Sequence, residues 1–68
     1  MTEFKIGDRV RITVDSDFAE GSAERFYSVG DTGEIVSITT NIWVLFDTFR
    51  LGWRDWAVYR EHMEVIND

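Results

Sequence analysis

The chain has 68 residues, which is enough for one small domain spanning residues 1–68. Its 13 acidic and 7 basic residues give a net charge of −6 at pH 7, the wrong sign for a general binder of nucleic-acid phosphates. The absence of cysteine excludes disulfides, thiolate metal sites and cysteine nucleophiles. A chain this short buries only about 60% of its unfolded surface, so a deep catalytic cleft is hard to build beside a core. We therefore expect a protein that is not an enzyme and holds no cofactor or metal.

The first expected strand contains Val10, Ile12 and Val14, which alternate with polar residues. A period of two is typical of a strand with one buried face. Gly7 and Asp8 precede it and favour a turn.

A long loop is expected over residues 15–28, where the alternation stops. It carries four acidic residues before its first basic residue, namely Asp15, Asp17, Glu20 and Glu24. Two acids spaced by one residue resemble the start of a calcium-binding loop, but Ala19 and Phe26 stand where later ligands are needed. We expect a solvated, mobile loop whose negative charge steers or repels partners.

The second expected strand covers residues 34–39, after a turn at residues 29–33. Its apolar positions do not alternate cleanly, so a bulge or strong twist near Gly33 would let Ile35 and Ile38 both face inward. A tight turn at residues 40–41 leads to the third strand, residues 42–47.

The third strand predicts an apolar outer surface. If Ile42, Val44 and Phe46 face the core, then Trp43 and Leu45 must point away from it.

The remaining chain is expected to be an irregular segment at 48–54, a strand at 56–58, a single tight turn at 59–62 and a closing strand at 63–66. Five short strands and no helix of ten residues predict an all-β, five-stranded small barrel with a long acidic loop after its first strand.

A family resemblance rests on segments that cover most of the chain. They are KIGDRVRI at residues 5–12, VGDTGEIVSI at 29–38, WVLFD at 43–47, WAV at 56–58 and MEV at 63–65. This pattern resembles the SH3-like barrels, and within them the KOW-type domains and the photosystem I accessory subunit superfamily. The resemblance implies a Gly-Asp turn before the first strand, a long loop after it and a one-turn helix before the last strand. It specifies fold more than function.

Two departures from related domains bear on function. KOW domains that hold RNA are usually basic, whereas the long loop here is acidic. Signalling domains that bind proline-rich peptides resemble this chain in shape, but their groove needs a tyrosine-rich loop, and this loop offers only Phe26 and Tyr27.

The candidate binding surface combines aromatic and arginine side chains, which are enriched at binding hot spots. Its residues are Trp43, Leu45, Trp53, Arg50 and Arg54, together with Arg9 and Arg11. The alternative is that these aromatic residues bind no partner and are covered by the long loop of the same chain. His62, the only histidine, lacks a catalytic partner in the sequence, and we expect it to have a structural or surface role.

These features predict a small accessory module that binds another protein, such as a regulator or inhibitor encoded by a phage or mobile element. The alternative is a KOW-type nucleic-acid-binding module that acts through Arg9, Arg11, Arg50 and Arg54. A third possibility, that the protein mimics nucleic acid with its acidic side chains, would need the carboxylates to form an ordered stripe, whereas the sequence places them mainly in one loop. A monomer or weak homo-oligomer is expected.

The predicted location is the cytoplasm, without membrane contact. The first six residues lack the basic and apolar regions of a secretory signal. The longest apolar run, residues 42–46, is far shorter than the roughly 20 residues that cross a bilayer.

Overall fold

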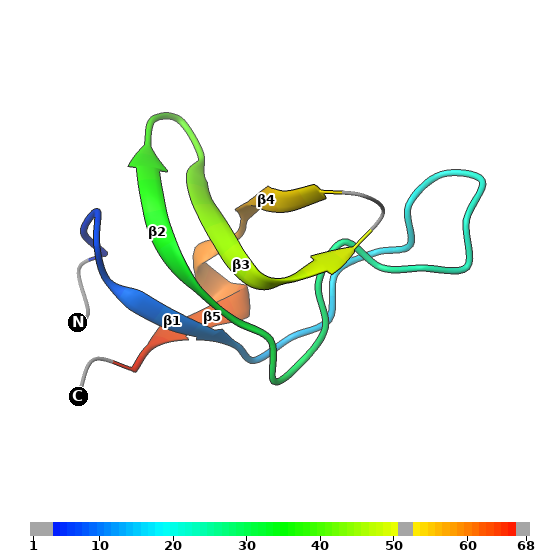
Figure 1. The fold of residues 1–68 in the computed structure, drawn as a ribbon, viewed down its shortest axis with the longest axis horizontal. Helices are drawn as coiled ribbons and strands as arrows, with labels where there is room; N and C mark the ends of the chain where they lie inside the picture. Colours follow the sequence, from blue (N-terminus) through cyan, green and yellow to red (C-terminus); the bar gives the residue numbers. More distant parts are fainter. Residues whose placement is uncertain (1–3, 51–52, 67–68) are drawn as a thin grey trace.

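The computed structural model describes residues 4–50 and 53–66, without the side chains of Phe49, Arg50 and Trp53. Five antiparallel strands form one sheet in the order β4-β3-β2-β1-β5. The strands are β1 (Arg9–Ile12), β2 (Thr32–Ile38), β3 (Ile42–Arg50), β4 (Trp53–Val58) and β5 (Met63–Val65), and the 3-10 turn η1 (Arg60–His62) precedes β5 (Figure 1). The predicted all-β class, five strands and single turn before the last strand are therefore confirmed.

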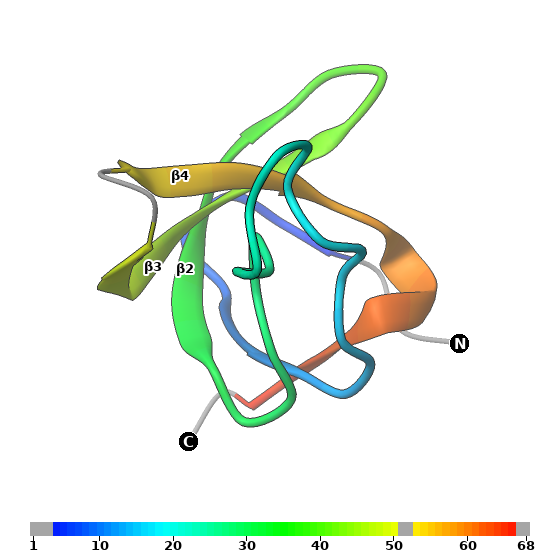
Figure 2. The ribbon, with the colours of Figure 1, turned by 90° about the vertical axis from the view of Figure 1, so that its right-hand side faces the viewer.

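The sheet is strongly bent along β2 and β3, and β1 and β2 are joined by a long connection, residues 13–31 (Figure 1). This segment, called the β1–β2 loop below, extends from one end of the sheet and faces the viewer in Figure 2. No helix in the described ranges is long and apolar enough to cross a membrane.

The core lies on the inner face of the sheet and follows the predicted alternation of β3. Ile42, Val44 and Phe46 are buried, whereas Leu45 is exposed and Trp43 is half-buried. The other buried apolar residues are Val10, Ile12, Tyr27, Ile35, Val58 and Met63. The outward direction of Trp43 and Leu45, predicted from the period of two, is therefore confirmed.

Val14 does not continue the buried face of β1, contrary to expectation, and is 44% exposed. β1 ends at Ile12, and the backbone amides of Thr13 and Val14 both donate to the carbonyl oxygen of His62, at 2.7 and 3.4 Å. The chain leaves the sheet at that point, so the alternation of the sequence no longer corresponds to the two faces of a sheet.

The irregularity of β2 is a bulge, but at Val36 rather than near Gly33. Ile35 pairs with Val44 and Ser37 pairs with Trp43, which leaves Val36 without a cross-strand partner. Ile35 is buried as predicted. Ile38 shares the inner face of its partner Ile42, as predicted, but as the last residue of the strand it remains 37% exposed.

Gly33 is needed for close packing of two strands. A Cβ atom at this position would lie 2.6 Å from the carbonyl oxygen of Leu45 and 2.7 Å from Cγ1 of Val44. Any larger residue would push β2 away from β3.

The segment 48–54, expected to be irregular, belongs largely to a hairpin. β3 continues to Arg50, β4 begins at Trp53, and these two residues pair. Both strands thus extend into a stretch whose side chains show no alternation, with an irregular register between Leu45 and Arg50.

Candidate functional site

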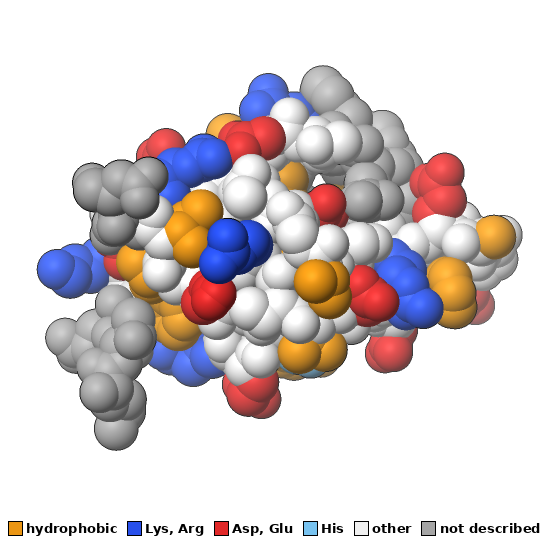
Figure 3. All heavy atoms as spheres, turned by 90° about the horizontal axis from the view of Figure 1, so that it is seen from below, with side chains coloured by type: hydrophobic (Ala, Val, Ile, Leu, Met, Phe, Trp, Pro, Cys, Tyr) orange, Lys and Arg blue, Asp and Glu red, His pale blue; other side chains and the backbone are white. Residues whose placement is uncertain are grey.

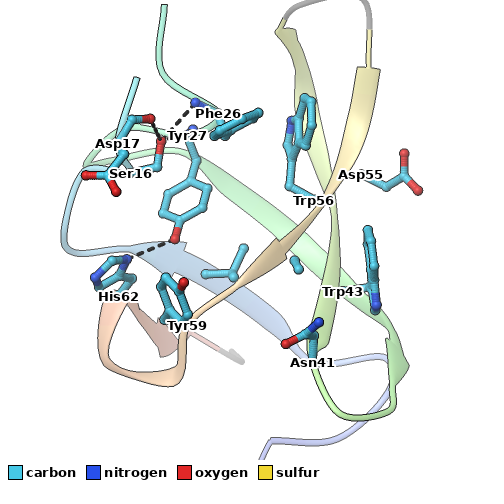
Figure 4. Close-up of a pocket in the computed structure, with 12 residues that line it drawn as sticks. Ser16, Asp17, Phe26, Tyr27, Asn41, Trp43, Asp55, Trp56, Tyr59 and His62 are labelled. Carbon is cyan, nitrogen blue, oxygen red and sulfur yellow. Dashed lines mark hydrogen bonds between the residues drawn. The ribbon is translucent and has the colours of Figure 1, made fainter. Parts of the chain in front are cut away.

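A groove runs along β4, between this strand, the β1–β2 loop and η1 (Figure 4). Its volume is about 610 Å³, within the range of roughly 300–1,000 Å³ that is common for ligand sites. The aromatic residues that line it are Phe26, Tyr27, Trp43, Trp56 and Tyr59, and the others are Ser16, Asp17, Asn41, Asp55, Ala57, Val58 and His62. We refer to it as the β4 groove.

Ser16 holds the loop side of the β4 groove in place. Its buried hydroxyl oxygen accepts hydrogen bonds from the backbone amides of Phe26 at 2.8 Å and Tyr27 at 3.1 Å, and the hydroxyl donates to the carbonyl of Asp17 at 2.9 Å. One side chain therefore fastens the beginning of the loop to its end and fixes the direction of both aromatic residues.

Tyr27 and His62 form the floor of the β4 groove. The Tyr27 hydroxyl is hydrogen-bonded to Nδ1 of His62 at 2.9 Å, and its ring stacks on Phe46 with centroids 5.9 Å apart. Burial raises the pKa of the Tyr27 hydroxyl above its ordinary value. Tyr59 packs edge-on against the His62 ring at 5.2 Å. His62 thus has a structural contact, in line with the role expected for it.

The two indoles of the β4 groove come from opposite faces of the sheet. Trp56 pairs with buried Val44 and therefore points to the inner face, where its ring meets Phe26 edge-on at 4.7 Å. Trp43 pairs with Ala57 and lies on the outer face. Figure 4 shows the two indoles on either side of β4, so the groove wraps around the edge of this strand.

The β4 groove is electrically negative. Among the described residues, its lining contains Asp17 and Asp55 but no lysine or arginine. Both aspartates are exposed, and neither carboxylate has a hydrogen bond or ion pair with any described residue. Unpaired carboxylates next to aromatic faces favour a positively charged ligand, because both attract cations.

The structure brings together only part of the candidate binding surface that was predicted around Trp43 and Trp53. Trp43 lines the β4 groove, whereas Leu45, 38% exposed, lies on the outer face between Glu34 and Asp55. Nε of Arg54 donates to the carbonyl of Phe46 at 2.9 Å. The side chains of Arg50 and Trp53 lie outside the described residues. Through Phe26 the β1–β2 loop packs on Trp56, an indole that was not assigned to the predicted surface.

The two arginines of β1 are paired with acids on the outer face of the sheet. Arg9 makes two hydrogen bonds to the Asp47 carboxylate, at 2.6 and 3.1 Å, and Arg11 lies 3.2 Å from Glu64. The Thr32 hydroxyl also donates to Asp47 at 2.6 Å. Together these donors lower the pKa of Asp47 to about 2, with the Arg9 hydrogen bond as the largest cause. Figure 3 shows one face of the molecule, on which basic and acidic side chains lie next to each other.

The acidic loop has internal structure that its composition does not predict. Phe18 and Arg25 form an isolated bridge, and the Arg25 guanidinium lies 4.2 Å from the centroid of the Phe18 ring. Nη1 of Arg25 donates to the carbonyl of Ser16 at 2.5 Å. Among the described residues, no three acidic or histidine side chains are grouped so as to hold a metal ion.

Phe26, Tyr27, Trp56 and Tyr59 are the aromatic groove residues absent from the predicted surface. In the sequence, Phe26 and Tyr27 form the aromatic end of the expected loop, but two aromatic residues are too few to form a groove by themselves. Their partners come from β4 and from the residue before η1, far away in the sequence. Only the path of the β1–β2 loop past β4 brings the two groups together.

The chain matches no protein-family model, and comparison with curated proteins and with solved structures found no significant match.

Proposed function

We propose that this chain is a non-enzymatic module that binds a segment of another protein in the β4 groove. The observation that carries the proposal is the gathering of five aromatic side chains, from the loop, β3, β4 and the start of η1, around one open groove. Aromatic residues are enriched where proteins bind other proteins, since they contribute a large contact area at small entropic cost.

An SH3-like barrel is the fold that we infer from the strand order and from η1, which directly precedes β5. The site lies between the long loop after the first strand and the turn before the last one. In this proposal the sheet is a rigid support, and specificity depends on the side chains that the loop and β4 present.

A protein partner is favoured over nucleic acid by the distribution of charge. The nucleic-acid alternative depends on four arginines, and two of them, Arg9 and Arg11, are in ion pairs with carboxylates. The β4 groove itself is lined by acids, which would repel phosphates.

The test is selection of random 12-residue peptides, displayed on phage, against the immobilised domain. A selected peptide, made synthetically, is then titrated against Tyr59→Ala and Phe18→Ala. Both substitutions remove an exposed aromatic ring, 68% and 56% exposed respectively, but only Tyr59 lines the groove. We expect Tyr59→Ala to weaken binding about tenfold, as truncation of a hot-spot residue does, and Phe18→Ala to leave it within about twofold.

Thermal unfolding of both variants establishes that they are folded before binding is compared. The proposal is overturned if selection returns no peptide whose binding depends on Tyr59, or if the two variants bind every selected peptide equally.

A further inference from the structure

β4 is an edge strand, and its outer edge faces the β4 groove. In the sheet order β4 stands at one end, next to β3 alone. The lining of the groove includes Asp55, Ala57 and Tyr59, which alternate along this strand and just beyond it. An edge strand carries backbone N–H and C=O groups that can pair with another chain.

The alternation of β3 carbonyls shows which residues of β4 point to that edge. The carbonyl oxygen of Leu45 lies against Gly33 of β2. Ile35, the β2 partner of Val44, directs its own amide and carbonyl away from β3, to Asp8 and Gly7. Successive residues of a strand direct their backbone groups to opposite sides, so Val44, next to Leu45, faces β4.

Val44 pairs with Trp56, so Trp56 faces β3, and its neighbours Asp55 and Ala57 direct their N–H and C=O groups to the outer edge. Tyr59 continues this parity. Its backbone amide interacts with the Tyr27 hydroxyl at the floor of the β4 groove, which opposes the rise in the Tyr27 pKa.

Apart from the Tyr27 hydroxyl at Tyr59, the β1–β2 loop does not occupy this edge. It reaches β4 through the ring of Phe26, which packs on Trp56. Within the described ranges, no backbone hydrogen bond joins the loop to β4. The groups of Asp55 and Ala57 are therefore open to a ligand, and the groove is the space in which that ligand would lie.

The two-sided shape of the groove fits an extended ligand. Side chains of a strand added beside β4 would point alternately to the two faces of the sheet. On the inner face they would meet Phe26 and Trp56, and on the outer face they would meet Trp43 and Asp55. A compact ligand would need only one of these surfaces.

Charge decides between a foreign segment and a second copy of this chain. Within the described structure, Asp17 and Asp55 are unpaired and no lysine or arginine lines the groove. A second copy would bring its own net charge of −6 to this acidic edge, which opposes pairing of β4 with itself. A segment that carries lysine or arginine would be attracted.

We propose that the partner enters as an extended, positively charged segment that adds a strand to the outer edge of β4. This inference rests on the proposed function and specifies the conformation and charge of the segment bound. Main-chain hydrogen bonds to Asp55 and Ala57 supply affinity, the aromatic residues select alternate side chains, and the two aspartates select for basic residues.

The first test is an N-methyl scan of a peptide selected on the domain. A methyl group on a peptide amide that pairs with β4 removes the donor and blocks the edge. We expect a loss of roughly tenfold or more at every second position and little change between them. In the complex, the Asp55 and Ala57 amides, followed by NMR hydrogen exchange, should gain protection.

The second test addresses charge with two double variants that each remove two negative charges. Asp17→Asn with Asp55→Asn alters the groove, and Glu20→Gln with Glu24→Gln alters exposed loop positions outside the groove lining. The first should weaken binding roughly threefold to tenfold, and the second much less, since two partly solvated ion pairs are lost only in the first.

The outcomes separate this inference from the proposed function. Binding that requires Tyr59 but shows no period-two methyl pattern and no protection of Asp55 and Ala57 overturns strand addition and leaves the binding module intact. Equal losses in the two double variants overturn the selection for basic residues. Protection of the same amides without peptide, together with a concentration-dependent dimer in sedimentation, overturns the assignment of the edge to a foreign segment.

Discussion

The hydroxyl of Tyr27 lies 2.9 Å from Nδ1 of His62, and this hydrogen bond connects the β1–β2 loop to η1. The same loop end is held from the other side by Ser16. The aromatic residues of the loop are therefore fixed before any ligand binds, and such preorganisation reduces the entropic cost of binding.

Tyr27→Phe should lower the free energy of unfolding by about 0.5–1.5 kcal/mol, because it removes the hydrogen bond to His62 and the interaction with the Tyr59 amide but keeps the stacked ring. Urea unfolding measures the change. Tyr59→Phe is the matched control, since Tyr59 is exposed and its hydroxyl has no hydrogen bond with the described residues. Equal effects of the two substitutions would contradict a stabilising link between Tyr27 and His62.

Ser16→Ala should cost about 1–3 kcal/mol of stability, because it leaves the amides of Phe26 and Tyr27 without their acceptor in a buried site. Ser22→Ala removes a hydroxyl that accepts from the Glu24 amide in an exposed turn, where water replaces it. We expect that control to change stability by less than about 0.5 kcal/mol in the same unfolding experiment. A Ser16 variant as stable as the Ser22 variant would show that the loop does not depend on this side chain.

Gly33→Ala should destabilise the domain by about 2 kcal/mol or more, because the new Cβ would collide with the Leu45 carbonyl on the neighbouring strand. Gly21→Asn is the control. Gly21 has φ of 74° with nothing within 4 Å of an added Cβ, and asparagine tolerates this left-handed conformation. Thermal unfolding measures both variants, and a Gly33 variant as stable as the Gly21 variant would contradict strand packing as the reason for glycine at position 33.

The Arg9–Asp47 pair should make stability depend on pH in the acid range. The pKa of Asp47 is lowered from 3.8 to about 2 in the folded state, so its contribution is complete above the unfolded value and is lost as the pH falls toward 2. Since both side chains are more than 40% exposed, solvent screening limits the contribution to about 0.5–1 kcal/mol.

Asp47→Asn should therefore be less stable than the parent protein at pH 6 and nearly as stable at pH 2. Asp17→Asn, which removes a carboxylate without an ion pair to any described residue, should show no such convergence. Parallel denaturation curves across pH 2–6 for the parent and Asp47→Asn would contradict the assignment.

The pattern of β3 could be predicted from sequence because its residues alternate over a full strand. Ile42, Val44 and Phe46 are buried, and the directions of Trp43 and Leu45 follow from the same period. Val14 continues an equally regular pattern, yet it lies beyond the end of β1. Periodicity indicates which residues share a face, but not where the neighbouring strand ends.

The candidate site could not be predicted in the same way. Arg9 and Arg11 looked like free positive charges, and the register of β1 against β5 and the approach of Asp47 place carboxylates against them. Phe26 and Trp56 belong to segments with no common pattern, and they meet because the β1–β2 loop passes along β4.

Length, charge and alternation by themselves determined a small, acidic, five-stranded all-β domain with an outward Trp43, since these properties follow from local spacing and composition. The tertiary structure alone decided that the aromatic residues surround the edge of β4 and that Asp17 and Asp55 remain unpaired there among the described residues. The physical reason is that contacts between distant segments depend on loop path and strand register, which no local pattern of side chains encodes.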